Sequence, residues 1–169
     1  MDLKVHVSEQ TILSLKKILN KDGVLIIEAS YLLDLIQNMV FDYIYHEHFS
    51  YFTVKVLRQL LAKCGLELIY VSGYTPKGGS IRAIAQHSDG RRDMDENVES
   101  FIKKEETAGL HDAETYIRFS KDINNLKKEL VELLKQIHST GHNIVGYGAT
   151  HNTTTLLYHF EMGEYIDFL

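Results

Sequence analysis

The sequence is poor in the residues that support several classes of protein. It holds one cysteine, Cys64, and no tryptophan among its 169 residues. A lone cysteine excludes an internal disulfide and any zinc site built from several cysteines. Acidic side chains outnumber basic ones, 23 to 18, and the net charge is −5. This balance disfavours a nucleic-acid partner, because binding to phosphates needs a basic excess.

Long apolar runs and a leader pattern are also missing. No run approaches the roughly 20 apolar residues that span a bilayer, so we expect no membrane partner. The opening sequence, MDLKVHVSEQ, lacks a basic segment followed by an apolar one, and a secretory signal is not expected. Together with the lone cysteine, this predicts a reduced, cytoplasmic protein.

What is present begins with alternating helix and strand signals. Ser8 can cap a helix that reaches about Lys21. The apolar run VLIIEAS, residues 24–30, is typical of a strand buried on both faces of a parallel sheet. Thr53 can cap a second helix, with Gly65 just beyond its end.

Two more strands are expected on either side of the sequence TPKGG. Residues 66–74 and 80–86 alternate as strands do, and the turn between them holds the only proline, Pro76. The pair predicts an antiparallel hairpin. Helix, buried strand, helix and hairpin make up half of an α/β sheet, so we expect residues 1–87 to be half of a domain.

Residues 88–140 are expected to form a linker and a long amphipathic helix. The sequence HSDGRRDMDEN is polar throughout. Beyond it, apolar residues recur at spacings of three and four, as in a helix seam. These residues are Tyr116, Phe119, Ile123, Leu126, Leu130, Leu133 and Ile137. The seam can pack on its own chain or on a second copy in a homodimer, and both interpretations stay open.

Residues 141–169 read as the start of a second α/β domain. HNIVGYGA, residues 142–149, predicts a strand that runs into a glycine turn, and TTTLLYHFEM predicts a helix. YIDFL, residues 165–169, is typical of the next strand. A βαβ unit that ends on its second strand leaves a face uncovered, so we expect this domain to be incomplete.

The densest polar cluster is FDYIYHEHFSYF, which follows the first strand, where ligands bind in open α/β sheets. His46 or His48 offers a base that works near neutral pH. Glu47 can orient that base, and Tyr43 and Tyr45 can hold an oxyanion. In an extended segment Tyr45 and Glu47 share one face, whereas in a helical turn Tyr45 and His48 are neighbours.

Two other interpretations of this cluster stay open. The histidines can simply hydrogen-bond to backbone in an aromatic-rich loop. His46, Glu47 and His48 are also chemically suited to bind a metal. No further pair of His, Asp or Glu stands at an obvious ligand spacing, so we expect no metal.

Two glycine-containing turns are weaker candidates. The Gly146–Gly148 turn can bring backbone amides to a phosphate at a helix N-terminus, or can serve tight packing of strand against helix. The third glycine of a dinucleotide fingerprint is replaced by His151. In the hairpin turn, Lys77 and Arg82 can bind an anion, although the glycines there also suit a hairpin.

Four segments in order resemble the S-adenosyl-L-methionine (SAM)-dependent C-methyltransferases that act on nucleotide-linked 4-keto-deoxysugars. They are DGVLIIEASYLLDLI, FDYIYHEHFSYFTV, TPKGGSIRAIAQ and GYGA, and IYHEHFSYF and KGGSIR are the most distinctive parts. The resemblance implies an α/β fold in which residues 1–87 are the C-terminal half of a class I, Rossmann-like methyltransferase domain. A helical connector and the start of a second Rossmann-like domain follow. The zinc cysteines and glycine-rich SAM loop of the family are absent. Where the family continues with a basic residue and a glycine, this chain has Asn152 and Thr153.

The resemblance also implies roles for individual residues. His48 corresponds to the base that removes the proton beside the ketone, and Tyr45 would hydrogen-bond the enolate oxygen. Glu47 would hold or tune this group. The implied substrate contacts are Tyr43, His46, Lys77 and Arg82. SAM is the implied cofactor, with no binding residue assigned to it in this chain.

The resemblance leaves alternatives for the chain as a whole. With the SAM motif absent, the isolated chain is expected to be weak or inactive. A second polypeptide can supply the SAM-binding half, as in a split enzyme. The alternative from another class is a non-catalytic remnant or interaction module that oligomerises through the helix seam.

Overall fold

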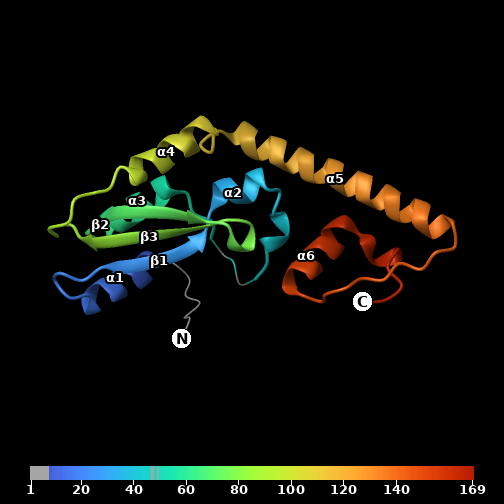
Figure 1. The fold of residues 1–169 in the computed structure, drawn as a ribbon, viewed down its shortest axis with the longest axis horizontal. Helices are drawn as coiled ribbons and strands as arrows, with labels where there is room; N and C mark the ends of the chain where they lie inside the picture. Colours follow the sequence, from blue (N-terminus) through green and yellow to red (C-terminus); the bar gives the residue numbers. More distant parts are fainter. Residues whose placement is uncertain (1–7, 47, 49) are drawn as a thin grey trace. The chain divides into compact units, whose positions relative to one another are not determined.

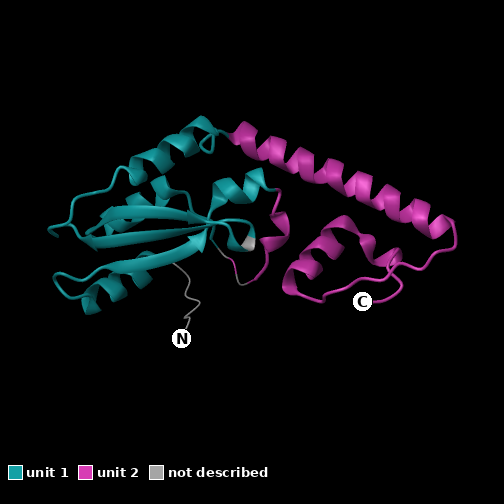
Figure 2. Ribbon diagram, viewed as in Figure 1, with its two compact units in different colours: residues 1–38, 50–112 teal, residues 39–49, 113–169 magenta. Residues whose placement is uncertain are grey.

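A computed structural model describes residues 8–46, 48 and 50–169 of the chain (Figure 1). The chain forms two compact units (Figure 2). Unit 1 comprises residues 1–38 and 50–112, and unit 2 comprises residues 39–49 and 113–169. The chain therefore leaves unit 1 for a short segment and returns to it, and that segment holds most of the polar cluster.

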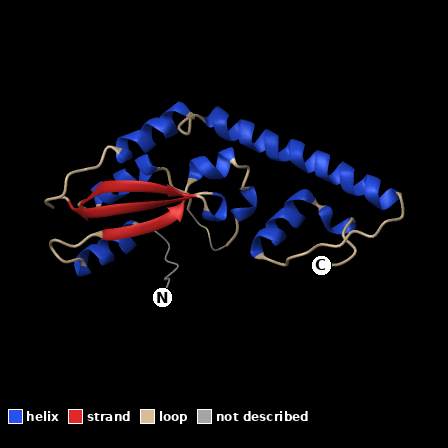
Figure 3. Cartoon of the chain, viewed as in Figure 1, coloured by secondary structure: helices blue, strands red, loops and turns tan. Residues whose placement is uncertain are grey.

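Unit 1 is built on a three-stranded antiparallel sheet (Figure 3). Its strands are β1 (Leu25–Ser30), β2 (Leu66–Tyr74) and β3 (Ser80–His87), in the order β1-β3-β2. The predicted hairpin is confirmed, because β2 and β3 pair antiparallel from Leu66 opposite His87 to Tyr74 opposite Ser80. A short 3₁₀ helix, η2 (Pro76–Gly78), makes the turn.

The prediction for β1 was wrong in its pairing and its burial. The strand pairs antiparallel with β3, not with a parallel neighbour. Its side chains alternate: Ile27 is 9% exposed and Ile26 is 57% exposed. The reason is that Ile27 faces the core of unit 1, where it clusters with Leu57 and Leu61, whereas in the described chain the face that holds Ile26 stays open.

Four helices complete unit 1. They are α1 (Glu9–Ile18), α2 (Leu32–Gln37), α3 (Val54–Lys63) and α4 (Asn97–Thr107). Both predicted caps are confirmed: the Ser8 hydroxyl accepts from the Thr11 amide at 3.2 Å, and the Thr53 hydroxyl from the Val56 amide at 3.1 Å. Gly65 follows α3 with a φ of 70°, as its C′ position requires. The helix that Ser8 caps ends at Ile18, before the predicted Lys21.

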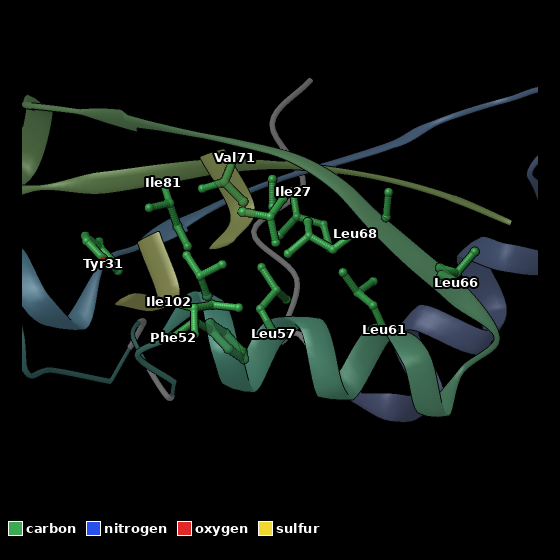
Figure 4. Close-up of a cluster of buried hydrophobic side chains, with 14 of the residues drawn as sticks. Ile27, Tyr31, Phe52, Leu57, Leu61, Leu66, Leu68, Val71, Ile81 and Ile102 are labelled. Atoms are coloured by element: carbon green, nitrogen blue, oxygen red, sulfur yellow. The ribbon is translucent and has the colours of Figure 1, made fainter. Parts of the chain in front are cut away.

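The core of unit 1 lies between α3 and one face of the sheet. In Figure 4, Leu57 and Leu61 of α3 point toward Leu68 and Val71 of β2 and Ile81 of β3. Full burial of such a side chain stabilises the fold by about 1.5–3 kcal/mol. This packing joins α3 to the sheet of unit 1.

The end of β1 and the start of α3 are joined directly. Tyr31 and Phe52 form a parallel bridge, and the Leu32 amide donates to the Phe52 carbonyl at 3.1 Å. Glu105 of α4 accepts hydrogen bonds from the first two amides of α3. The parts of unit 1 that precede and follow segment 39–49 in the sequence are therefore hydrogen-bonded to each other.

Unit 2 is mainly helical. Its elements are η1 (Phe41–Tyr43), α5 (Ala113–Ser139), α6 (His151–Phe160) and η3 (Met162–Glu164). The predicted long helix is confirmed as α5. Phe41 stacks on Phe160 with ring centroids 5.1 Å apart, and both belong to a core that includes Ile123.

The predicted strand, helix and strand at the end of the chain are found in reduced form. Val145 and Phe168 make a single parallel bridge, with α6 between them in the sequence. Hydrogen bonds of 2.9 Å flank it, from the Gly146 amide to the Phe168 carbonyl and from the Asp167 amide to the Ile144 carbonyl. The pairing is parallel, as a βαβ unit requires.

In the part of the chain that the structure describes, every helix is too short or too polar to cross a membrane.

Candidate functional site

The described residues 41–46 and 48 form η1 and, after it, a hydrogen-bonded turn. The Tyr45 amide donates to the Tyr43 carbonyl at 3.1 Å, and the His48 amide donates to the Tyr45 carbonyl at 2.9 Å. The second bond spans three residues, so Tyr45 and His48 lie on the same side of a turn. Their ring centroids are 4.9 Å apart with an interplanar angle of 73°. Of the two arrangements left open by the sequence, the helical turn is the one observed.

Four of the predicted site residues gather in this turn. The Tyr43 ring lies 5.8 Å from His48 and 6.3 Å from Tyr45, and the His46 ring lies 5.9 Å from Tyr45. Partial burial raises the pKa of the Tyr43 phenol, and the neighbouring Tyr45 and Asp42 raise it further. A phenol is already protonated near neutral pH, so the Tyr43 hydroxyl can donate a hydrogen bond.

Helix α6 adds a residue that sequence reasoning missed. The His151 ring stacks on Tyr45 with centroids 5.5 Å apart, and meets His46 edge-on at 5.2 Å. In the sequence His151 stood out only as the residue replacing a glycine. No spacing rule places it beside Tyr45, because the two lie on distant segments.

Two hydrogen bonds attach the same segment to α6. The Thr155 hydroxyl donates to the Ile44 carbonyl at 3.1 Å, and the Asn152 amide donates to the Asp42 carboxylate at 3.3 Å. The ring cluster of Tyr43, Tyr45, His46, His48 and His151 is thus built from two segments of unit 2.

The Gly146–Gly148 turn uses its glycines for geometry. Gly148 has a φ of 102°, which favours glycine, and a Cβ on Gly146 would overlap the Leu169 side chain. The Thr153 hydroxyl donates to the Gly148 carbonyl at 2.8 Å and accepts from the Thr150 amide at 3.3 Å. These contacts favour the packing interpretation over a phosphate site.

Arg82 belongs to unit 1, on β3. Its guanidinium donates to the Glu28 carboxylate at 2.9 Å and lies 4.5 Å from the centroid of the Tyr74 ring. Its charge is thus already balanced by a cross-strand partner. Lys77 lies in η2 of the same unit, and its side chain is outside the description.

Glu47 also lies outside the described residues. Among the residues that are described, no three His, Cys, Asp or Glu side chains are placed to hold a metal ion. The described cluster of imidazoles and phenols offers a proton acceptor beside hydrogen-bond donors, which suits acid–base chemistry.

Comparison with known proteins adds to this geometry. A family model described as "C-methyltransferase C-terminal domain" matches residues 75–169, which include Arg82 and α6. The C-methyltransferase NovU of Streptomyces niveus is 30% identical over 140 residues. The alignment covers 83% of this chain and 33% of NovU, so the chain spans about a third of that relative's length. The chain therefore belongs to the C-methyltransferase family, of which it carries the C-terminal part.

Proposed function

We propose that the chain carries the acceptor-side site of a SAM-dependent C-methyltransferase, acting on a nucleotide-linked 4-keto-deoxysugar. The observation that supports this most directly is the pairing of Tyr45 and His48, whose ring centroids are 4.9 Å apart. Such a pair joins a base to a hydroxyl donor, the combination needed to remove a proton beside a carbonyl. The name of NovU supports C-methylation, whereas the sugar acceptor rests on the sequence resemblance.

In the proposed reaction His48 takes the proton from the carbon next to the ketone. Imidazole suits this step because its ordinary pKa lies near physiological pH. The electron pair of the broken C–H bond passes into an enolate, whose oxygen accepts a hydrogen bond from the Tyr45 hydroxyl. The Tyr43 hydroxyl, a phenol that is protonated near neutral pH, can donate a second one. SAM is the proposed source of the electrophilic methyl group.

The remaining candidates have supporting roles in the proposal. Glu47 would hold or tune His48, and His46 would contact the sugar from the same turn. Lys77 and Arg82 would contact the nucleotide part of the acceptor as cations. Arg82 now forms an ion pair with the Glu28 carboxylate at 2.9 Å. To bind the acceptor, it would have to exchange this carboxylate for a negatively charged group of the nucleotide.

The described residues do not fit the methyl donor. The Gly146–Gly148 turn is the one glycine-rich strand-to-helix turn noted in the sequence, and hydrogen bonds of Thr150 and Thr153 already occupy it. We assign no residue of this chain to SAM, so the isolated chain is proposed to be weak or inactive in methyl transfer.

The sheet suggests where a donor-binding part would join. In the described chain β1 pairs on one side only, with β3. The unpaired backbone groups of a strand edge are a site for adding another strand. We propose that a Rossmann-like sheet continues past β1 and that residues 1–87 are half of that domain. Residues 88–140 would connect it to a second Rossmann-like domain, which would start at residue 141.

We also propose that the protein is located in the cytoplasm.

A second candidate function is an interaction module that forms a homodimer. Leu126, Leu133 and Ile137 of the α5 seam are 40%, 51% and 37% exposed, whereas Ile123 of the same seam is buried. Exposed leucines at seam spacing can pair with another helix. Sedimentation velocity would then show a dimer that Leu133→Lys dissociates.

Calorimetry with the sugar nucleotide and with SAM distinguishes the proposed enzyme from the interaction module. The leading proposal predicts that the chain binds a nucleoside diphosphate-linked 4-keto-6-deoxyhexose, and that His48→Ala or Tyr45→Phe weakens binding by less than tenfold. It also predicts no heat of binding with SAM alone. Binding of neither molecule would favour the interaction module, and tight binding of SAM by this chain would contradict the assignment of the donor site elsewhere.

A further inference from the structure

Tyr45 occupies the centre of the ring cluster. Its centroid lies 4.9 Å from His48, 5.5 Å from His151, 5.9 Å from His46 and 6.3 Å from Tyr43. The rings of Tyr43, His46 and His48 come from the same chain segment as Tyr45. Among the four neighbours, His151 is the one that comes from another segment, helix α6, so its backbone position is set by that helix.

The start of α6 fixes the backbone of His151. Thr150 and Thr153 form a capping box, in which each side chain accepts from the other's backbone amide. His151 is the first residue after this cap, and the positive φ of Gly148 turns the chain into the helix. The cap and the turn together direct the His151 ring.

The same helix also holds the backbone next to Tyr45. Thr155, one turn along α6 from His151, binds the carbonyl of Ile44, the residue directly before Tyr45. Asn152 binds Asp42. One helix therefore holds both the backbone that carries Tyr45 and a face of its ring.

We infer that His151 is a positioning residue, which keeps the Tyr45 ring oriented so that its hydroxyl meets the enolate oxygen. The inference rests on the proposed function for the role of Tyr45, but not for the contact itself. A hydrogen-bond donor stabilises developing charge best when it is held in place before the reaction. A ring stacked at an interplanar angle of 30° limits tilting of the phenol toward α6. In this proposal the role of the Gly146–Gly148 turn is to place His151 at the start of α6.

Nuclear magnetic resonance of the full chain with ¹³C-labelled tyrosine tests the inference without turnover. Tyr45→Phe assigns the Tyr45 ring signals. His151→Leu keeps an apolar side chain but removes the ring, and His151→Phe restores a ring. His138→Ala, an exposed histidine of α5 in the same unit, is the matched control.

We expect His151→Leu to move the Tyr45 ring signals, because the ring-current contribution of the stacked imidazole is lost. His151→Phe should keep a ring-induced shift, and His138→Ala should leave the signals where they are. Tyr45 signals that are the same in His151→Leu and the original protein would overturn the inference. So would equal movement in the His138→Ala control.

Turnover gives the second readout. In deuterium exchange at the carbon beside the ketone, His151→Leu should slow the rate roughly tenfold, as expected for a misaligned catalytic group, and His151→Phe should recover part of it. The ring signals could move in His151→Leu while neither the original chain nor any variant catalyses the exchange. In that case the contact between His151 and Tyr45 stands and the proposed function fails.

Discussion

Glu105 is a carboxylate with no exposed surface that binds the first two backbone amides of α3. Burial raises the pKa of Glu105, and the two amide hydrogen bonds oppose this only in part. The phenol of Tyr31 is buried beside it, and burial together with the Glu105 charge raises the Tyr31 pKa as well. Glu105 thereby ties α4 to the start of α3, a few residues after the chain returns to unit 1.

This carboxylate has a predictable effect on stability. Its pKa in the folded state is above the ordinary value of 4.5, so the folded state holds the proton more tightly than the unfolded state. The contribution of Glu105 to the free energy of unfolding should therefore rise as pH falls from the raised pKa toward that ordinary value. This is the reverse of a carboxylate whose pKa is lowered by a salt bridge.

Urea unfolding of the original protein and Glu105→Gln, at several pH values between about 8 and 5, measures this contribution. Near neutral pH we expect the variant to be less stable by about 1–2 kcal/mol, because an amide cannot accept from both backbone N–H groups as a carboxylate does. The difference between the two proteins should grow as pH falls. A difference that shrinks over this range would contradict the account.

Among the elements, α3 is the one that carries the core of unit 1. Leu57 and Leu61 have no exposed surface and face the sheet (Figure 4). Leu61→Ala should lower the free energy of unfolding by about 2–5 kcal/mol, through lost burial and the cavity that remains. Leu133→Ala on α5, where the leucine is 51% exposed, is the control and should cost less than about 1 kcal/mol. Equal losses in urea unfolding would mean that α3 does not pack as described.

Elements with local signals were predictable from the sequence. Ser8 and Thr53 predict where α1 and α3 begin, because a helix cap depends only on residues within one turn of it. The hairpin follows from alternation and a short turn. Helix α2 has only six residues, too few for a helical period to show. The pairing of β1 depends on which strand lies beside it, and its burial depends on what packs over its two faces. An apolar run alone supplies neither.

The same distinction holds for the candidate site. The turn that joins Tyr45 to His48 was one of two local arrangements that spacing allowed, and the structure selects it. The contact between Tyr45 and His151 is not local, since it needs unit 2 to bring segment 39–49 to α6. Side chains that meet through tertiary packing leave no spacing pattern in a single sequence.

At the scale of the whole molecule, each of the two units contributes different residues to the proposed function. Unit 1 offers the sheet, its β1 edge and Arg82, while unit 2 holds the described rings of the cluster. The family match from residue 75 to 169 begins in the hairpin turn of unit 1 and runs through α5 and α6. In the proposed reaction, proton abstraction uses the ring cluster, whereas methyl transfer also needs a donor site that we propose lies outside the described residues. The two steps should therefore be separable by experiment.

The most direct measurement is deuterium exchange into a nucleoside diphosphate-linked 4-keto-6-deoxyhexose in D₂O, followed by mass spectrometry without any methyl donor. The account predicts exchange at the carbon beside the ketone above the uncatalysed rate. His48→Gln should lower that rate by about 10²–10⁴-fold or to background, as for loss of a general base. His138→Ala should exchange as fast as the original protein. Exchange that is absent from the original chain, or that survives His48→Gln unchanged, would contradict the claim that His48 is the base.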